Sequence, residues 1–198
     1  IKKRKDGNDY LAMVYAGPVR GAGGTAAAFS LILGDYLRKK TGYDSYDADN
    51  SEINRYITEL DDYHERVTNL QYKPSSEELE FLVKNLPVEI DGDPTEELEV
   101  SNYKDLPRVG TKRIRGGVCL VLSMLALKAP KLWKEVSKLK NFDIGWGFLK
   151  EFIEIQKKKK AKKDVLDKKQ INPDYTYISD LVAGRPVLSF PLRVGGFR

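Results

Sequence analysis

The run Val118-Cys-Leu-Val-Leu-Ser-Met-Leu-Ala-Leu127 decides the fold of this 198-residue chain. It is apolar on every side of a helix, which is typical of a helix at the centre of a core. It is also far shorter than the roughly 20 apolar residues that cross a bilayer. We therefore predict a buried helix around which the other elements pack, with no membrane span.

Helical patterns lie on both sides of this run. Each predicted helix has a start or stop signal of its own, either a cap, a glycine or a proline. The predicted helices are Ala26–Lys39 (Thr25 as cap, Gly42 as stop), a helix capped by Ser51 with an apolar stripe from Ile53 to Leu70, a helix opened by a capping box of Ser75 and Glu78 and ended by Pro87, a second piece starting at Pro130, and a helix from Trp146 to Ile155.

Strand signals are fewer and short. Tyr10–Tyr15 reads as a buried strand that enters a turn, and Val88–Ile90 and Leu98–Val100 alternate apolar and acidic residues around Asp91-Gly-Asp-Pro94. That alternation predicts a small hairpin with one wet face. The fold class is accordingly α+β, a mostly helical domain with a small hairpin or sheet and, as one option, a KH-like arrangement around the glycine loop described below.

Opposite charges gather in the two halves of the chain. Residues 1–100 hold 12 Lys/Arg and 20 Asp/Glu, a charge of −8, whereas residues 101–198 hold 22 and 9, a charge of +13. Acidic residues repel a polyanion, and clustered lysines and arginines favour one because they release its counterions. A nucleic acid should therefore meet the second half, although a basic stretch can equally be a solvated surface.

Four glycines fall within the loop Gly17-Pro-Val-Arg-Gly-Ala-Gly-Gly24. The loop joins the predicted strand to the start of the predicted helix, where unpaired amides and the helix dipole attract an anion. Gly21-x-x-Gly24 also matches the GxxG loop of KH modules. Two interpretations stay open, a phosphate-contacting loop and a tight turn that only packs.

Candidate DNA-binding residues come from this loop and from the basic stretch that precedes the apolar run. Their proposed role is to hold backbone phosphates without reading bases. They are Arg20, Gly21, Gly23, Gly24, Thr25, Lys112, Arg113 and Arg115.

No catalytic site is visible among the remaining polar residues. Asp91 and Asp93 could bind a metal, but Asp-Gly before a proline is ordinary turn chemistry. The single histidine, His64, lies beside an apolar stripe and is expected to bond a neighbouring backbone or tyrosine, and the single cysteine, Cys119, is expected to be an inert buried thiol. One cysteine and one histidine exclude an internal disulfide and a structural zinc site and suit a reducing, cytoplasmic setting.

Several blocks together resemble a known family, the large subunit of archaeal family D DNA polymerase. They occur in the family's order and span nearly the whole chain. The blocks are Tyr15-Ala-Gly-Pro-Val-Arg-Gly-Ala-Gly-Gly-Thr-Ala26, Leu70-Gln-Tyr72, Pro87-Val-Glu-Ile-Asp-Gly92, Arg113-Ile-Arg-Gly-Gly117, Ala183-Gly-Arg-Pro186 and Gly195-Gly-Phe-Arg198.

The resemblance implies a segment near the amino end of a replicative DNA-directed DNA polymerase, a nucleotidyltransferase that works as a heterodimer. It further implies a small subunit with 3′–5′ exonuclease activity, DNA as a partner, and a sliding clamp bound through other regions of the parent. Mg²⁺ would act in the parent's distant catalytic core, so we expect no catalytic residue, metal or cofactor in this segment. The loop departs from the family at Gly21-Ala22, where the family has a serine pair, which shifts the expected contacts from hydroxyls to backbone amides.

We expect three parts: a core domain over 1–150, a variable lysine-rich helix or linker over 151–177, and an extended exit over 178–198. The predicted function is an accessory domain that positions DNA through phosphate contacts. One alternative is a structural scaffold for subunit assembly without DNA contact, and another is an autonomous nuclease or nucleotidyltransferase that uses Asp91 and Asp93.

Overall fold

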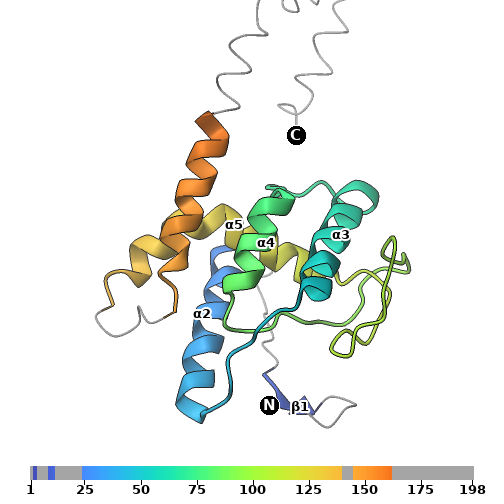
Figure 1. Cartoon of the computed structure of the whole chain (residues 1–198), viewed down its shortest axis with the longest axis horizontal. Helices are drawn as coiled ribbons and strands as arrows, with labels where there is room; N and C mark the ends of the chain where they lie inside the picture. The colour runs from blue at the N-terminus through green and yellow to red at the C-terminus, as the bar shows by residue number, and fades with distance from the viewer. Residues whose placement is uncertain (1, 4–8, 12–23, 140–144, 162–198) are drawn as a thin grey trace, which may run out of the picture. The chain divides into compact units, whose positions relative to one another are not determined.

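The computed structural model describes residues 2–3, 9–11, 24–139 and 145–161 (Figure 1). Chain contacts divide the protein into two units, Ile1–Glu154 and Ile155–Arg198. Of the described residues, only 155–161 belong to the second unit.

The apolar run lies in the first half of one long helix, α5 (Gly116–Val136). Leu122, Leu125 and Ala126 are at most 1% exposed, so this helix is the centre of the core as predicted. The prediction of a second piece starting at Pro130 is wrong, because α5 continues through that proline to Val136. A proline inside a helix removes a hydrogen bond, but Pro130 faces solvent while Ala129 and Leu132 on either side are buried.

Because α5 is one helix of 21 residues, it is long and apolar enough to cross a membrane, contrary to the length argument made from sequence. Half of its apolar stretch is buried inside the protein, against α2, α3 and α4. A core helix passes the same test of length and composition, and the packing here is that of a core helix.

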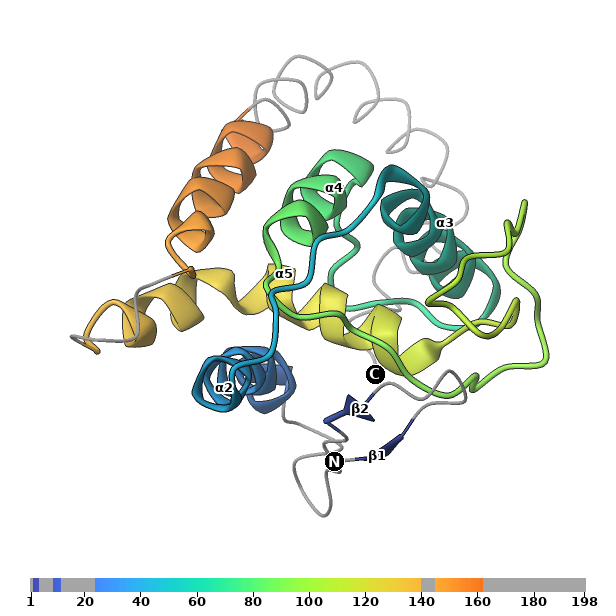
Figure 2. The same cartoon turned by 60° about the horizontal axis from the view of Figure 1, so that its bottom comes forward.

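Two layers of helices enclose α5. Helix α2 (Gly24–Thr41) packs on one side of it, and α3 (Asn50–Arg66) and α4 (Ser76–Asn85) pack on each other and on its opposite side (Figure 2). Residues 148–154 of the first unit are also helical, and Trp146, Leu149 and Phe152 are fully buried. The Trp146 indole Nε1 donates to Asp35 Oδ2 at 2.9 Å, which ties this segment to α2.

Capping chemistry sets the starts of α3 and α4. The predicted box of Ser75 and Glu78 is present, with Glu78 N–H donating to Ser75 Oγ and Ser75 N–H to the Glu78 carboxylate. The cap predicted at Ser51 is wrong by two residues, because Asp49 forms an equivalent box with Glu52. Gly42, at φ 77°, ends α2 as expected.

Strand content is very small in the described residues. A two-stranded antiparallel pair joins β1 (Lys2–Lys3) to β2 (Asp9–Tyr10), and most of the predicted strand Tyr10–Tyr15 lies outside the described residues. The predicted hairpin is wrong, since residues 98–100 pair with 112–114 through an isolated bridge of Glu99 and Arg113. Opposite charges across this bridge favour that pairing over one with the equally acidic 88–90 segment. A mostly helical fold is confirmed, whereas a KH-like arrangement is not.

Candidate nucleic-acid interface

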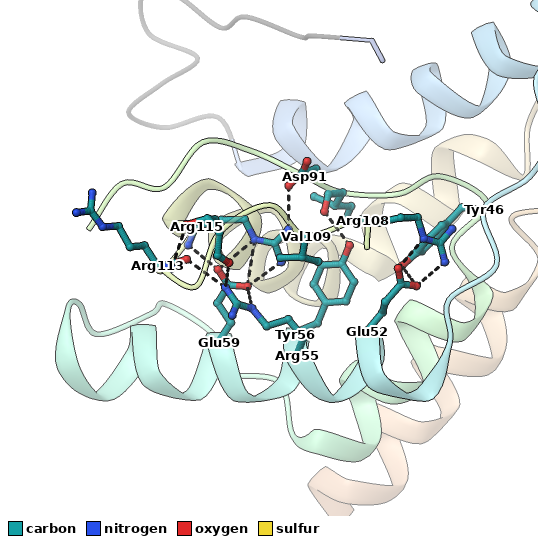
Figure 3. Close-up of polar contacts among 12 residues, drawn as sticks. Tyr46, Glu52, Arg55, Tyr56, Glu59, Asp91, Arg108, Val109, Arg113 and Arg115 are labelled. Atoms are coloured by element: carbon teal, nitrogen blue, oxygen red, sulfur yellow. Dashed lines mark hydrogen bonds and ion pairs between the residues drawn. The ribbon is translucent and has the colours of Figure 1, made fainter. Parts of the chain in front are cut away.

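A chain of ion pairs connects α3 to the basic stretch that precedes α5 (Figure 3). Its centre is Arg115, whose side chain is 1% exposed. Arg115 Nη2 contacts Glu59 Oε2 at 2.8 Å and Nη1 contacts Asp91 Oδ1 at 2.9 Å. Burial alone would lower the pKa of Arg115, but the hydrogen bonds and the negative charge of Glu59 outweigh it and raise that pKa. Arg115 therefore stays charged inside the fold.

Arg55, one turn before Glu59 in α3, also pairs with the Glu59 carboxylate. Its Nε donates to Glu59 Oε2 at 3.1 Å, and its Nη2 donates to the backbone oxygens of Thr111 and Arg113. These bonds hold the basic stretch against α3 by its backbone. The guanidinium groups of Arg55 and Arg115 thus share the single negative charge of Glu59, and Asp91 supplies a second negative charge to Arg115.

Arg108 is held in the same way nearer the start of α3. Its Nε and Nη2 each donate to the Glu52 carboxylate at 2.6 Å, and Nη2 also bonds the carbonyl of Asp47. Its guanidinium lies over the ring of Tyr46. A bidentate pair of this kind is geometrically specific, so Arg108 fastens the loop rather than presenting a charge to a ligand.

These contacts change the expected set of phosphate contacts. Arg115 is buried and fully engaged, which is inconsistent with a direct contact to DNA. Lys112 and Arg113 are exposed, but Lys112 Nζ lies 2.7 Å from Glu99 Oε1 and Arg113 Nη2 lies 2.7 Å from Glu97 Oε2. The basic stretch is thus neutralised by acids from the preceding half of the chain.

Of the predicted glycine-loop residues, Arg20, Gly21 and Gly23 lie outside the described residues. Gly24 and Thr25 form the first turn of α2, where backbone amides carry the positive end of the helix dipole. Gly24 lies against α5, since a Cβ at this position would collide with Met124 Sδ and come within 3.6 Å of Lys128 Cε. The start of α2 and Lys128 are therefore neighbours.

From Lys128, cations continue along the solvent side of α5. Lys131 and Lys134 are exposed, and within the described residues neither they nor Lys128 form an ion pair. Lys138, then Lys134 and Lys131, lower the pKa of Glu135, the one acid among them. We call Gly24, Thr25, Lys128, Lys131 and Lys134 the α2–α5 basic surface. The candidates chosen from the sequence did not include these three lysines, although their three-residue spacing on a helix indicates a shared face.

The remaining candidates have structural partners. His64 Nδ1 accepts the backbone N–H of Leu70 at 3.1 Å, which confirms the expected backbone bond. Cys119 is buried, and burial raises the pKa of its thiol, in keeping with an inert side chain. Asp91, one of the two carboxylates considered for a metal, accepts a hydrogen bond from Arg115 Nη1 at 2.9 Å.

The family model described as "DNA polymerase II large subunit DP2, N-terminal" matches residues 1–155, and that of its central domain matches residues 159–198. The chain belongs to the archaeal DNA polymerase II large subunit family. Proteins named DNA polymerase II large subunit from Methanosarcina barkeri and Nanoarchaeum equitans are 51% and 47% identical to it over the whole of this chain. A third, from Methanococcoides burtonii, is 47% identical, again over the whole chain.

The chain spans only 17–18% of the length of these large subunits. The boundary between the two family models, at residues 155–159, falls next to the division of contacts after Glu154.

Proposed function

We propose that this part of a DNA polymerase II large subunit is an accessory domain that positions DNA through phosphate contacts. The polymerase activity, its Mg²⁺ chemistry and its small exonuclease subunit belong, in this proposal, to the larger assembly in the cytoplasm. The sliding clamp would bind through other regions of the parent. The segment itself supplies binding and no catalytic group.

The observation that carries the proposal is the α2–α5 basic surface. Amides at the start of a helix and lysine side chains are both suited to phosphate oxygens. The predicted loop residues Arg20, Gly21 and Gly23 directly precede Gly24 in sequence, so they belong to the proposed contact set. Lys112 and Arg113 are exposed but ion-paired with Glu99 and Glu97, so we assign them a smaller part in the contact than the α5 lysines.

Salt dependence of DNA binding tests the proposal. We expect the chain to bind a labelled primed duplex at about 50 mM salt. The logarithm of its association constant should fall linearly with the logarithm of the salt concentration. The double variant Lys131→Ala, Lys134→Ala should reduce the steepness of that line by about 2, because each phosphate contact contributes roughly 0.9. Fluorescence anisotropy measures both quantities.

Lys73→Ala, Lys84→Ala is the matched control. It removes the same charge, but both lysines are ion-paired, Lys73 with Asp61 and Lys84 with Glu80. The slope of the control should stay within experimental error of the parent chain. Unmeasurable binding at low salt, or equal slopes for the two double variants, would contradict the proposal.

A scaffold without DNA contact is the second candidate, and one observation favours it. Phe29, Leu33, Tyr36 and Leu37 are each 38–43% exposed, and their spacing places them on one face of α2. Such a stripe is typical of a surface that another protein covers. Under this alternative, Leu33→Glu would abolish co-purification with the polymerase small subunit while leaving the melting temperature unchanged; unaltered co-purification would contradict it.

A further inference from the structure

Backbone pairing fixes the position of Lys112 and Arg113 at the surface. The N–H of Val100 donates to the carbonyl of Lys112 at 2.9 Å, and the N–H of Ile114 donates to the carbonyl of Leu98 at 3.0 Å. Val100 and Ile114 are buried in the core. The core therefore sets the register in which the acids of 97–99 lie beside the bases of 112–113.

Arg113 holds its guanidinium in a geometry that suits a phosphate. Its Nη2 lies 2.7 Å from Glu97 Oε2, and its Nη1 donates to Glu97 Oε1 at 3.3 Å. Two such bonds side by side are also how arginine binds the oxygens of a phosphate. The Arg113 side chain is 47% exposed and extends away from the other labelled arginines (Figure 3). The Glu97 carboxylate thus occupies the position that a phosphate would take.

Lys112 is arranged in the same way with Glu99. Its Nζ lies 2.7 Å from Glu99 Oε1, and both side chains are more than half exposed. Exposed ion pairs contribute little to stability, because water and salt screen them. A phosphate can therefore displace these carboxylates. By contrast, the acids that pair with Arg108 and Arg115 are buried, so those pairs do not exchange with a ligand.

We propose that Glu97 and Glu99 compete with DNA for Arg113 and Lys112, and so mask a second phosphate-contacting surface before the start of α5. This inference rests on the DNA-positioning function proposed above and concerns how that contact is limited. A carboxylate of the same chain is always present beside its cation at a high local concentration. The two acids therefore lower the affinity of the chain for DNA.

The test is DNA binding by the double variant Glu97→Gln, Glu99→Gln, followed by fluorescence anisotropy with the labelled primed duplex. Glutamine keeps the size of the side chain and removes its charge. We expect affinity to rise about tenfold at about 50 mM salt, as for two exposed ion pairs that no longer have to be displaced. The salt dependence should steepen by about 2, because each freed cation adds roughly 0.9. The neighbouring acids Asp93 and Glu96 are unchanged in every variant and cannot cause a difference.

Glu65→Gln, Glu80→Gln is the matched control, because it changes the net charge by the same amount. Glu65 Oε1 lies 3.5 Å from Lys73 Nζ and Glu80 Oε1 lies 2.6 Å from Lys84 Nζ, again in exposed pairs. This variant should change the affinity for DNA by less than about twofold, since screened charges away from the contact act weakly. Equal gains in the two double variants would reflect net charge alone and would overturn the proposal.

A double-mutant cycle identifies the cations concerned. Lys112→Ala, Arg113→Ala should weaken DNA binding less than about twofold in the parent chain and about tenfold in the Glu97→Gln, Glu99→Gln background. All four side chains are exposed, so the variants should fold as the parent does, which circular dichroism checks. Equal losses in the two backgrounds would show that the carboxylates do not govern these cations.

Failure of this inference and failure of the proposed function give different results. If the parent chain binds DNA and Glu97→Gln, Glu99→Gln binds no more tightly, the DNA-positioning function stands and the masking is wrong. If only Glu97→Gln, Glu99→Gln binds DNA measurably, the masking is right and the α2–α5 basic surface is not sufficient for the contact. Absence of binding by both chains would overturn both proposals.

Discussion

Glu59 carries one negative charge between two arginines. It is fully buried, and both Arg55 and Arg115 depend on it for compensation. Removing one member of a buried charge network leaves the others uncompensated in a medium where isolated charges are costly. Glu59 is therefore the residue on which the junction of α3 with the basic stretch most depends.

We expect Glu59→Gln to lower the free energy of unfolding by about 3 kcal/mol, the usual range for breaking a buried pair. Urea unfolding followed by tryptophan fluorescence measures it. Glu65→Gln is the control on the same helix, since that side chain is 68% exposed, and its effect should stay within about 0.5 kcal/mol. Equal effects of the two changes would show that the buried network contributes nothing.

Asp35 connects stability to pH. Burial alone would raise its pKa, but hydrogen bonds from Lys39, Arg38 and Trp146 outweigh burial and lower it. A carboxylate with a lowered folded-state pKa contributes stability above its unfolded value near 3.9, and that contribution is lost as pH falls through the folded value. The chain should therefore lose stability in acid below about pH 4 partly through this group.

Asp35→Asn should cost about 1–3 kcal/mol at neutral pH, because it removes the charge from bonds with Lys39 and Arg38. The difference from the parent chain should shrink as pH falls below about 4. Urea unfolding at pH 7 and pH 3 measures this. A difference that stays constant between the two pH values would contradict the assignment.

At the scale of elements, the start of α5 depends on close packing. Gly116 N–H donates to Thr95 Oγ1 at 2.9 Å, and a Cβ at Gly116 would lie 2.6 Å from that oxygen and 2.9 Å from Tyr63 Cε2. Nothing lies within 4 Å of a Cβ at the neighbouring Gly117. Close packing therefore requires a glycine at position 116 but not at position 117.

Gly116→Ala should destabilise the fold by about 1–3 kcal/mol through this overpacking. Gly117→Ala should be neutral or stabilising by up to about 1 kcal/mol, because alanine favours helix more than glycine does. Thermal unfolding of the two variants checks the pair. The interpretation fails if Gly117→Ala is the more harmful change.

Some local signals predicted element ends correctly, although the cap expected at Ser51 was not among them. The box of Ser75 and Glu78 and the stop at Gly42 depend on residues a few positions apart, and both are confirmed. Continuity of α5 through Pro130 depends instead on burial against other helices. The partner of residues 98–100 likewise depends on charges in 112–114, which lie beyond the range of any turn signal.

The candidate site was harder to predict for a related reason. Arg108 pairs with Glu52, and Arg115 pairs with Glu59, in each case an acid 56 residues earlier in the chain. No sequence pattern joins residues at that separation. The basic residues of 108–115 therefore predict phosphate contacts from sequence, whereas in the fold their charges are paired with carboxylates. The lysines of α5 could be grouped by helical spacing, but only the fold shows that Lys128, Lys131 and Lys134 form no ion pair with the other described residues.

At the scale of the whole molecule, the acidic first half and the basic second half are not two opposed surfaces. Carboxylates of α3 and of residues 97–99 meet the arginines and lysines of 108–115 across their junction. The excess positive charge is therefore carried by residues outside this junction, including Lys128, Lys131 and Lys134. We expect chemical cross-linking of bound DNA to label the α5 lysines in preference to Lys112, with peptide mass spectrometry as the readout; the reverse preference would contradict this.

The interlocking of α3 with residues 108–115 has a consequence for any attempt to divide the gene. A polypeptide ending at Val100 would leave Glu52 and Glu59 exposed to water, and one starting at Ser101 would begin with an unbalanced row of guanidinium groups. We expect each fragment to be unstructured when expressed separately and the two to reassemble when co-expressed, as circular dichroism would show. Each half then requires the other in order to fold.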